Sequence, residues 1–402
     1  MRVVIITILA FLTFNTLAQE TYSKFFDARP GIRCRWQNML VEDESLIISA
    51  TFSGNTSVVS SLIRFDLFGD SIDSNQYSDF VLGIEQSVIK VNNGYDLIGN
   101  PWTIDDNGAR GNMLVHLDDS LQVLSLEELF YKEKIAINTM GIQLGTGEKR
   151  VYFETVPTTG FTDTRSHILI LDAENDTIKY NIEFGSPLAI KYADYNISVL
   201  QETPDGELLF MATPQFIGEA GFLFEIMKIN RSGEILSRIV GRQQIDNNAM
   251  VQDEKGDIYF FTKDIPYELN SEQSLPDGFG GMSKVNANMD SVLWSRPLGF
   301  SADPNDIERR IHQARGMRHL PDNNFIAYGN ARHFTNPTKF GFITKFNSNG
   351  DIIWSRFYRP QLSEDDFRES SIEQCEELPD GRIICMGISL SLIHISEPTR
   401  PY

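Results

Sequence analysis

The residues that could carry chemistry are few, and they are scattered along the 402-residue chain. The sequence contains no HExxH, CxxCH, GxSxG or P-loop motif, and no GxGxxG that follows a strand. The histidines lack the cysteine or carboxylate spacing typical of zinc sites. Apart from His394 near the end, they are His116, His167, His312, His319 and His333. The sequence therefore predicts no cofactor and no metal site.

Acidic residues offer no clearer catalytic signal. The segment Asp105–Gly108 reads DDNG, but it lacks the alternating oxygen ligands and the terminal glutamate of a calcium loop. The chain has 55 Asp and Glu residues, so many pairs could be imagined as the acid and base of a glycosidase. Because no pair stands out, whether the protein is an enzyme stays open, and we favour a protein that is not one.

The three cysteines could form a disulfide. Cys375 and Cys385 flank the three-residue turn Pro379–Gly381, and antiparallel pairing would place them opposite each other within bridging distance. Cys34 is an alternative partner if the fold brings the chain ends together. Three free thiols are the remaining alternative.

The elements that must position these residues form a repeat. Two kinds of hairpin alternate along the chain. The first kind has Pro-Asp-Gly or Asn-Gly turns. In the second kind, the first strand ends in the pattern apolar-x-apolar and is followed by an Asn or Asp that begins the turn. The first kind recurs with an average period of about 56 residues. Its turns are centred on Asp43, Asn93, Thr146, Asp205, Lys255, Asp322 and Asp380.

Four antiparallel strands per period predict an all-β, seven-bladed β-propeller over residues 19–389. The last blade is expected to be truncated after its second strand. A run of immunoglobulin-like sandwiches is less favoured, because each would need about 100 residues. The blades are expected to start near Cys34, Ser87, Asn138, Asn196, Asn247, His312 and Ser370.

The N-terminal segment is predicted to close the ring. TYSKFFDAR at Thr21–Arg29 is similar to IWSRFYRP at Ile353–Pro360, which is read as a fourth strand. Thr21–Phe26 is therefore expected to supply the fourth strand of blade seven and to remove two exposed sheet edges. An unpaired leader is the alternative. A short surface helix is expected over Asp303–Arg315, with Asp303 as its cap.

Long connections predict the binding face. The first–second and third–fourth turns of each blade are short, whereas the second–third and fourth–first connections are long and emerge on the opposite face. Long loops tend to carry function. Their aromatic and charged residues suit an extracellular glycan or protein ligand. The candidate binding residues are Trp102, Arg110, Phe161, Tyr267, Arg332 and His333.

The two ends are predicted to lie outside the fold. Residues 1–18 have Arg2, an apolar stretch Val3–Leu12 and a small-x-small site before Gln19, as in a secretory signal peptide. Leu390–Arg400 resembles, residue for residue, the translation of a transposase adapter used in sequencing libraries. We therefore expect the native frame to stop near Ser389 and residues 390–402 to be an adapter sequence.

Charge and hydropathy limit the kinds of partner that the protein is expected to bind. The formal net charge of −20 argues against nucleic acid, because phosphate binding needs clustered Lys and Arg. No second long apolar run is present, so no membrane span is expected. We expect an exported monomer at the cell surface or outside the cell, with the periplasm as the alternative.

The repeats PDGxIxxxG and KFNxxGDIIWSR resemble those of secreted propellers of the quinoprotein-dehydrogenase-like (PQQ-like) superfamily, of the kind often followed by a type IX secretion sorting domain. The resemblance covers roughly residues 20–389. The Asp…Thr-Gly-Lys…Trp blade motif and adjacent cysteines of true quinoproteins are absent.

The favoured function is a non-catalytic exported propeller that binds a glycan or protein through its long-loop face. The alternatives are a glycan-active hydrolase or lyase, a degenerate quinoprotein, and a sensor or adhesin module of a longer polypeptide.

Overall fold

The structure is a computed structural model, and every described secondary-structure element in it is a β-strand. The described residues are 33–53, 58–82, 87–101, 111–130, 134–143, 147–157, 165–184, 192–216, 222–243, 249–262, 281–297, 310–333, 339–358, 370–378 and 380–388. Residues 1–18 and 390–402, and the predicted closing strand Thr21–Phe26, lie outside them.

The strands fall into seven sheets, one for each predicted blade. Blades one and two contain β1 (Arg33–Val41), β2 (Ser45–Ser53), β3 (Val58–Asp66), β4 (Ser71–Tyr77), β5 (Phe80–Leu82), β6 (Val88–Val91), β7 (Gly94–Pro101), β8 (Asn112–Leu117) and β9 (Val123–Phe130). Blades three and four contain β10 (Lys134–Gln143), β11 (Lys149–Pro157), β12 (Arg165–Leu171), β13 (Ile178–Phe184), β14 (Tyr192–Glu202), β15 (Leu208–Phe216), β16 (Phe222–Ile229) and β17 (Ile235–Gln243). Blades five, six and seven contain β18 (Ala249–Gln252), β19 (Ile258–Thr262), β20 (Gly281–Val285), β21 (Val292–Pro297), β22 (Arg310–His319), β23 (Phe325–His333), β24 (Lys339–Phe346), β25 (Ile352–Tyr358), β26 (Ser371–Glu377) and β27 (Ile383–Ile388).

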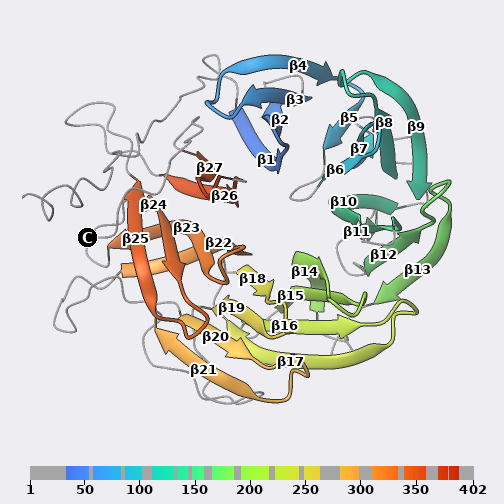
Figure 1. Ribbon diagram of the computed structural model, residues 1–402. Helices are drawn as coiled ribbons and strands as arrows, with labels where there is room; N and C mark the ends of the chain where they lie inside the picture. The colour runs from blue at the N-terminus through green and yellow to red at the C-terminus, as the bar shows by residue number, and fades with distance from the viewer. Residues whose placement is uncertain are drawn as a thin grey trace, which may run out of the picture.

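Each sheet is a blade set radially around a common axis (Figure 1). The first strand of each blade lies nearest the axis and the fourth lies at the outer rim. Blade two departs slightly, because β5 and β6 share the first-strand position and both pair with β7. All strand pairs are antiparallel, as the alternating hairpins predicted.

The blade count corrects one prediction. Six blades have all four strand positions, whereas the sequence predicted a seven-bladed ring whose last blade is truncated after its second strand and closed by the N-terminal strand. Among the described residues, the seventh sheet consists of β26 and β27 alone. The reason is that no described segment follows β27 to pair with its outer edge, and the segment expected as its fourth strand is not described.

The predicted surface helix at Asp303–Arg315 is also wrong in its second half. Arg310 begins β22, which pairs with β23 along its whole length. Pairing within the blade satisfies the backbone groups of Arg310–Arg315 as part of a strand, and this outweighs local helix preference. The first half of the predicted helix lies outside the described residues.

One recurring turn explains the Asn and Asp residues of the repeat. In the third–fourth turn of blade six, the Asn347 side-chain oxygen accepts hydrogen bonds from the backbone N–H groups of Asn349 and Asp351. Gly350 then adopts φ +79° and donates its N–H to the Asn347 carbonyl. The same pattern surrounds Asp253 in blade five. A short polar side chain therefore caps each such turn, and a residue in the left-handed region completes it.

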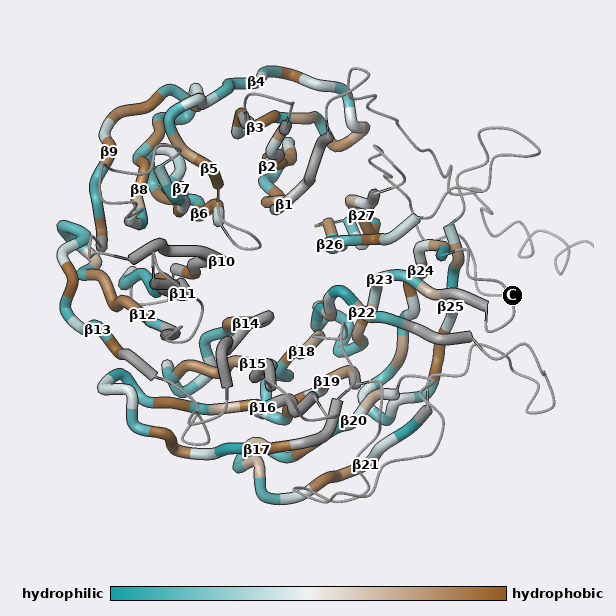
Figure 2. Tube along the Cα trace, turned by 180° about the vertical axis from the view of Figure 1, so that it is seen from behind, coloured by the Kyte–Doolittle hydropathy of each residue, from teal (hydrophilic) through white to brown (hydrophobic). Residues whose placement is uncertain are grey.

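The core lies between neighbouring blades. Each interface has its own buried apolar cluster; the one between blades four and five includes Met211, Ile226 and Phe260. The outermost strands are different, because they carry exposed apolar residues such as Ile178 and Leu236. Figure 2 shows this as alternating apolar and polar segments along β13 and β17.

Blade seven contains a disulfide between Cys375 and Cys385. The two residues are directly opposite in the β26–β27 register, and their Cα atoms are 4.1 Å apart. Both are buried, in a cluster with Ile326 and Ile343 of blade six. The crosslink therefore holds the two strands of the last sheet together inside an interblade core.

Candidate functional site

Most of the binding residues expected from the sequence cannot be placed. Trp102, Arg110, Phe161 and Tyr267 lie outside the described residues. Arg332 and His333 were assigned to a loop, but they are the last two residues of β23. They pair with Ile311 and Arg310 of β22, and Arg332 also pairs with Lys339. The second strand of blade six is therefore longer than the sequence predicted.

The described residues form a hollow at the axis, on the face built by the short turns. We call this face the turn face. The hollow has a volume of about 540 Å³ and lies where the innermost strands of blades three to six end. It is lined by Ile142, Leu200, Gln201, Glu202, Thr203, Pro204, Val251, Gln252, Asp253, Glu254 and His319.

The lining of this axial hollow is rich in hydrogen-bond acceptors. Glu202, Asp253 and Glu254 place three carboxylates around it, and the described lining contains no Lys or Arg. Asp253 is fixed by its turn and by Lys284, whose Nζ is 3.4 Å from an Asp253 oxygen. His319 stacks on Phe325, and its Nε2 is buried without a hydrogen-bond partner. A ligand that offers positive charge or hydrogen-bond donors would meet complementary groups here.

A second candidate site appears when equivalent positions of the blades are compared. One second-strand position pairs with the last apolar residue of the third strand. It is Lys149 in blade three, whereas in the other four-stranded blades it is apolar or aromatic: Leu46, Tyr95, Leu208, Ile258 and Phe325. The next position is Asp96 in blade two and Arg150 in blade three. The residues at this next position in the other four-stranded blades are Ile47, Leu209, Tyr259 and Ile326.

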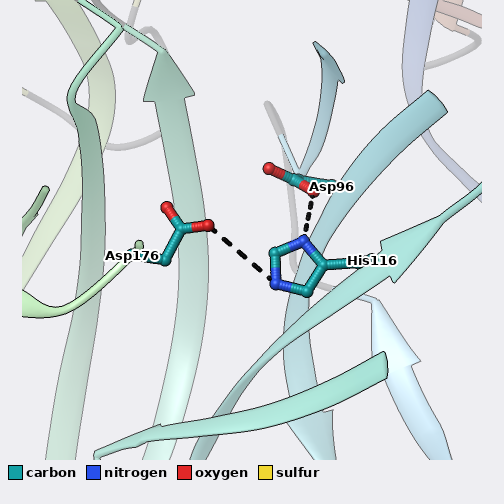
Figure 3. A group of neighbouring side chains, drawn as sticks. All are labelled: Asp96, His116 and Asp176. Atoms are coloured by element: carbon teal, nitrogen blue, oxygen red, sulfur yellow. Dashed lines mark hydrogen bonds and ion pairs between the residues drawn. The ribbon is translucent and has the colours of Figure 1, made fainter. Parts of the chain in front are cut away.

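Two of these charged residues, Asp96 and Lys149, meet at the interface of blades two and three. Figure 3 shows Asp96 beside His116 and Asp176. Asp96 on β7 accepts a hydrogen bond from Nδ1 of His116 on β8, at 2.7 Å. The other ring nitrogen, Nε2, is 3.9 Å from an oxygen of Asp176 and 3.5 Å from an oxygen of Glu127 on β9. Lys149 pairs with Asp96 and is 2.8 Å from Asp176, which closes the network.

Local structure explains how Asp176 reaches this network. It lies in the turn between β12 and β13, with φ +54°, and its N–H bonds to the Asp172 carbonyl. Gly69, Gly233 and Gly350 occupy the corresponding left-handed position in other blades. Asp tolerates this conformation better than most residues. Leu121 and Met289 occupy this position in blades two and five, so glycine is not required there. In blade three this left-handed turn position carries a carboxylate.

The network is held largely out of water. The side chains of Asp96 and Lys149 are 2% and 7% exposed, and that of His116 is 21% exposed. Burial acts to raise the pKa of Asp96, but the hydrogen bonds with His116 and Lys149 bring it below its usual value. The hydrogen bond to Asp96 raises the pKa of His116, against the effect of burial. Burial acts to lower the pKa of Lys149, yet Asp176 and Asp96 hold it above its usual value.

Sequence reasoning counted His116 among the histidines that lack the spacing typical of zinc sites. It also missed Asp96, Lys149 and Asp176. Two signals pointed to them: charged residues at second-strand positions that are apolar or aromatic in the other four-stranded blades, and an Asp at a turn position that is Gly in three other blades. Their proximity became visible only when neighbouring blades were placed side by side.

The sheet topology makes this chain a β-propeller. No protein-family model matches it, and no curated protein matches its sequence. Similar solved structures include Drosophila Semaphorin 2a, with a TM-score of 0.48, 10% identity, and coverage of 95% of this chain and 78% of that one.

A second similar structure is the β-propeller domain of the Trilobed protease from Pyrococcus furiosus. Its TM-score is 0.46 with 8% identity, and the match covers 92% of this chain and 97% of that one. A third is prolyl oligopeptidase B from Galerina marginata, with a TM-score of 0.46 and 11% identity over 90% of this chain and 47% of that one. In the part of the chain that the structure describes, no helix is long and apolar enough to cross a membrane.

Proposed function

We propose that the protein is an exported, non-catalytic β-propeller that binds a protein or peptide partner at the axial hollow of its turn face. The observation that carries this proposal is the concentration of Glu202, Asp253 and Glu254 around a hollow on the axis. Carboxylates gathered in a concave site concentrate positive ligands and discriminate against negative ones.

The lining favours a basic side chain as the bound group. Aliphatic walls formed by Ile142, Leu200 and Val251 suit the methylene chain of a lysine or arginine, and the carboxylates suit its charged end. Glycan sites, by contrast, commonly present aromatic rings. Among the described lining residues, the aromatic ring is that of His319, which stacks on Phe325. The hollow therefore supports a basic peptide better than a neutral sugar.

Export is supported by the disulfide between Cys375 and Cys385, because such bonds persist in oxidising compartments. The narrower assignments stay predictions: the signal peptide at residues 1–18, the PQQ-like family, the type IX sorting route and the monomeric state. A contribution of the long-loop residues Trp102, Arg110, Phe161 and Tyr267 to binding also stays a prediction.

A panel of fluorescent ligands tests the proposed class of partner. Peptides with exposed Arg or Lys, their citrulline or norleucine counterparts, and neutral oligosaccharides are titrated against the full chain by fluorescence anisotropy. The proposal expects binding of the basic peptides alone, weakening as salt is raised. Binding of the oligosaccharides with equal or higher affinity than the basic peptides would overturn it.

A further inference from the structure

We propose that His116, Glu127 and Asp176 form a Zn²⁺ site at the interface of blades two and three, with Asp96 as the positioning residue for His116. The donors come from three separate segments: β8, β9 and the β12–β13 turn. The site lies on the turn face but is separate from the axial hollow and independent of the function proposed for it.

The spacing of the donor atoms fits a small tetrahedral ion. Nε2 of His116 is 3.5 Å from Oε1 of Glu127 and 3.9 Å from Oδ2 of Asp176. Zinc bonds of about 2.0–2.1 Å place neighbouring tetrahedral ligands roughly 3.3–3.4 Å apart. These two separations from Nε2 are within about 0.6 Å of the spacing that zinc requires. A water molecule would complete the coordination.

The hydrogen bond to Asp96 orients the histidine as zinc-binding histidines are commonly oriented. A carboxylate only accepts hydrogen bonds, so Nδ1 of His116 donates to Asp96. In neutral His116, this leaves the lone pair of Nε2 facing the carboxylates of Glu127 and Asp176 (Figure 3). A lone pair that faces two carboxylates suits a cation bound between them, and the hydrogen bond to Asp96 holds the ring in that orientation.

The formal charge of the cluster agrees with a divalent cation. Asp96, Glu127 and Asp176 carry three negative charges, and Lys149 supplies one positive charge. A divalent ion beside a neutral His116 balances the remaining two. Lys149 does not block this position, because a carboxylate oxygen of Asp176 can accept a hydrogen bond and ligate a metal with its two lone pairs.

The donor set favours zinc over calcium or magnesium. Those hard cations take oxygen ligands, and calcium needs six to eight of them, whereas an imidazole nitrogen with two carboxylates suits zinc. The site is also open to entry from solvent. Glu127 is 47% exposed and His116 is 21% exposed, while the orienting Asp96 is buried behind them.

Calorimetric titration of ZnCl₂ into the untagged, EDTA-treated full chain tests this site. The proposal expects one Zn²⁺ per chain. Glu127→Gln, at an exposed position that the fold tolerates, should weaken binding by at least about tenfold, and His116→Gln by about 100-fold. Asp96→Asn, which removes the orienting carboxylate, should weaken it by about tenfold. CaCl₂ at the same concentration should give no binding heat.

The matched control is Glu128→Gln, which removes an exposed carboxylate from the neighbouring residue on the opposite face of β9. It should leave zinc affinity unchanged, as should His319→Gln at the axial hollow. Circular dichroism checks that each variant is folded. Wild-type protein that binds no Zn²⁺, or that binds it equally well after Glu127→Gln and His116→Gln, would overturn the proposal.

Discussion

Asp96 of blade two and Lys149 of blade three form a buried ion pair across an interblade interface. Asp96 occupies a second-strand position that is Ile47, Leu209 or Ile326 in other blades, where interblade packing is apolar. The ion pair therefore takes the place of an apolar contact at one point of an interface that otherwise keeps an apolar core, which includes Ile98 and Leu169. Each charge is tolerated because the other, together with His116 and Asp176, compensates it.

Removing one partner of this ion pair should lower the stability of the fold. Lys149→Leu leaves Asp96 buried without its cation, and we expect a loss of about 3 kcal/mol in the free energy of unfolding. The double variant Asp96→Ile with Lys149→Leu restores the residue types found in other blades and should recover most of this loss. Urea denaturation of the three proteins provides the measurement. Equal stability of the single and double variants would contradict the compensation argument.

Substitution of the neighbouring residue, Arg150, should have the opposite effect on stability. Arg150 is fully buried, its Nε and Nη1 have no hydrogen-bond partner, and burial lowers its pKa. Its partner Glu148 also pairs with Lys179 and Arg231, so it would keep cations without Arg150.

We therefore expect Arg150→Leu to unfold at the same or a higher urea concentration than the wild type. Lys149→Leu serves as the adjacent comparison. If Arg150→Leu loses as much stability as Lys149→Leu does, the buried charge of Arg150 must also be compensated by its surroundings.

Substitutions at two glycines can separate the cost of backbone strain from the cost of side-chain packing. Gly206 and Gly350 have φ values of +77° and +79° in equivalent kinds of turn. A Cβ at Gly206 would meet nothing closer than 3.9 Å, whereas one at Gly350 would lie 2.8 Å from the Trp294 ring.

Gly206→Ala should therefore cost about 1–2 kcal/mol from the left-handed backbone alone. Gly350→Ala should cost more, because Trp294 must also move. Thermal or urea unfolding compares them, and an equal cost for both substitutions would contradict the packing contribution of Trp294.

Glu377 gives a pH dependence with a defined sign. Burial raises its pKa, with Asp322 adding to the effect and Lys345 opposing it, and its Oε2 has no hydrogen-bond partner. The folded state therefore favours the protonated acid. Protonated Glu377 stabilises the folded state at pH values below the pKa that this residue has in the unfolded chain. This stabilisation is lost as the pH rises through the higher pKa of the folded state.

Glu377→Gln should remove that loss, so the variant should gain stability relative to the wild type between about pH 4 and about pH 7. Urea midpoints across this range provide the measurement, with the exposed Glu174→Gln as the control. A constant difference between Glu377→Gln and wild type at every pH would contradict the prediction.

The local architecture was predictable because each hairpin carries its own signal. Turns such as those at Asp205 and Asp322 lie between alternating apolar residues, and Trp294 and Trp354 occupy the same repeat position, opposite Lys284 and Lys345. These features depend on residues close in sequence. The number of complete blades was not predictable in the same way, because pairing at the edge of a sheet can involve segments that are far apart in the sequence.

The clustered charges escaped prediction for a related reason. Asp96 and His116 are 20 residues apart, but Lys149 and Asp176 belong to the next blade. Such contacts form only when the blades stack side by side. The helix predicted over Asp303–Arg315 was wrong from Arg310 onward, because pairing of β22 with β23 outweighs local helix preference.

The most direct test of the binding proposal removes charge from the axial hollow without changing shape. A basic peptide is titrated by anisotropy against wild type and against Glu202→Gln with Glu254→Gln. The matched control, Glu174→Gln with Glu234→Gln, removes the same charge from exposed third–fourth turns of the same face. The account predicts at least a tenfold loss of affinity for the hollow variant and little change for the control. Equal affinity of all three proteins would contradict binding at the axis.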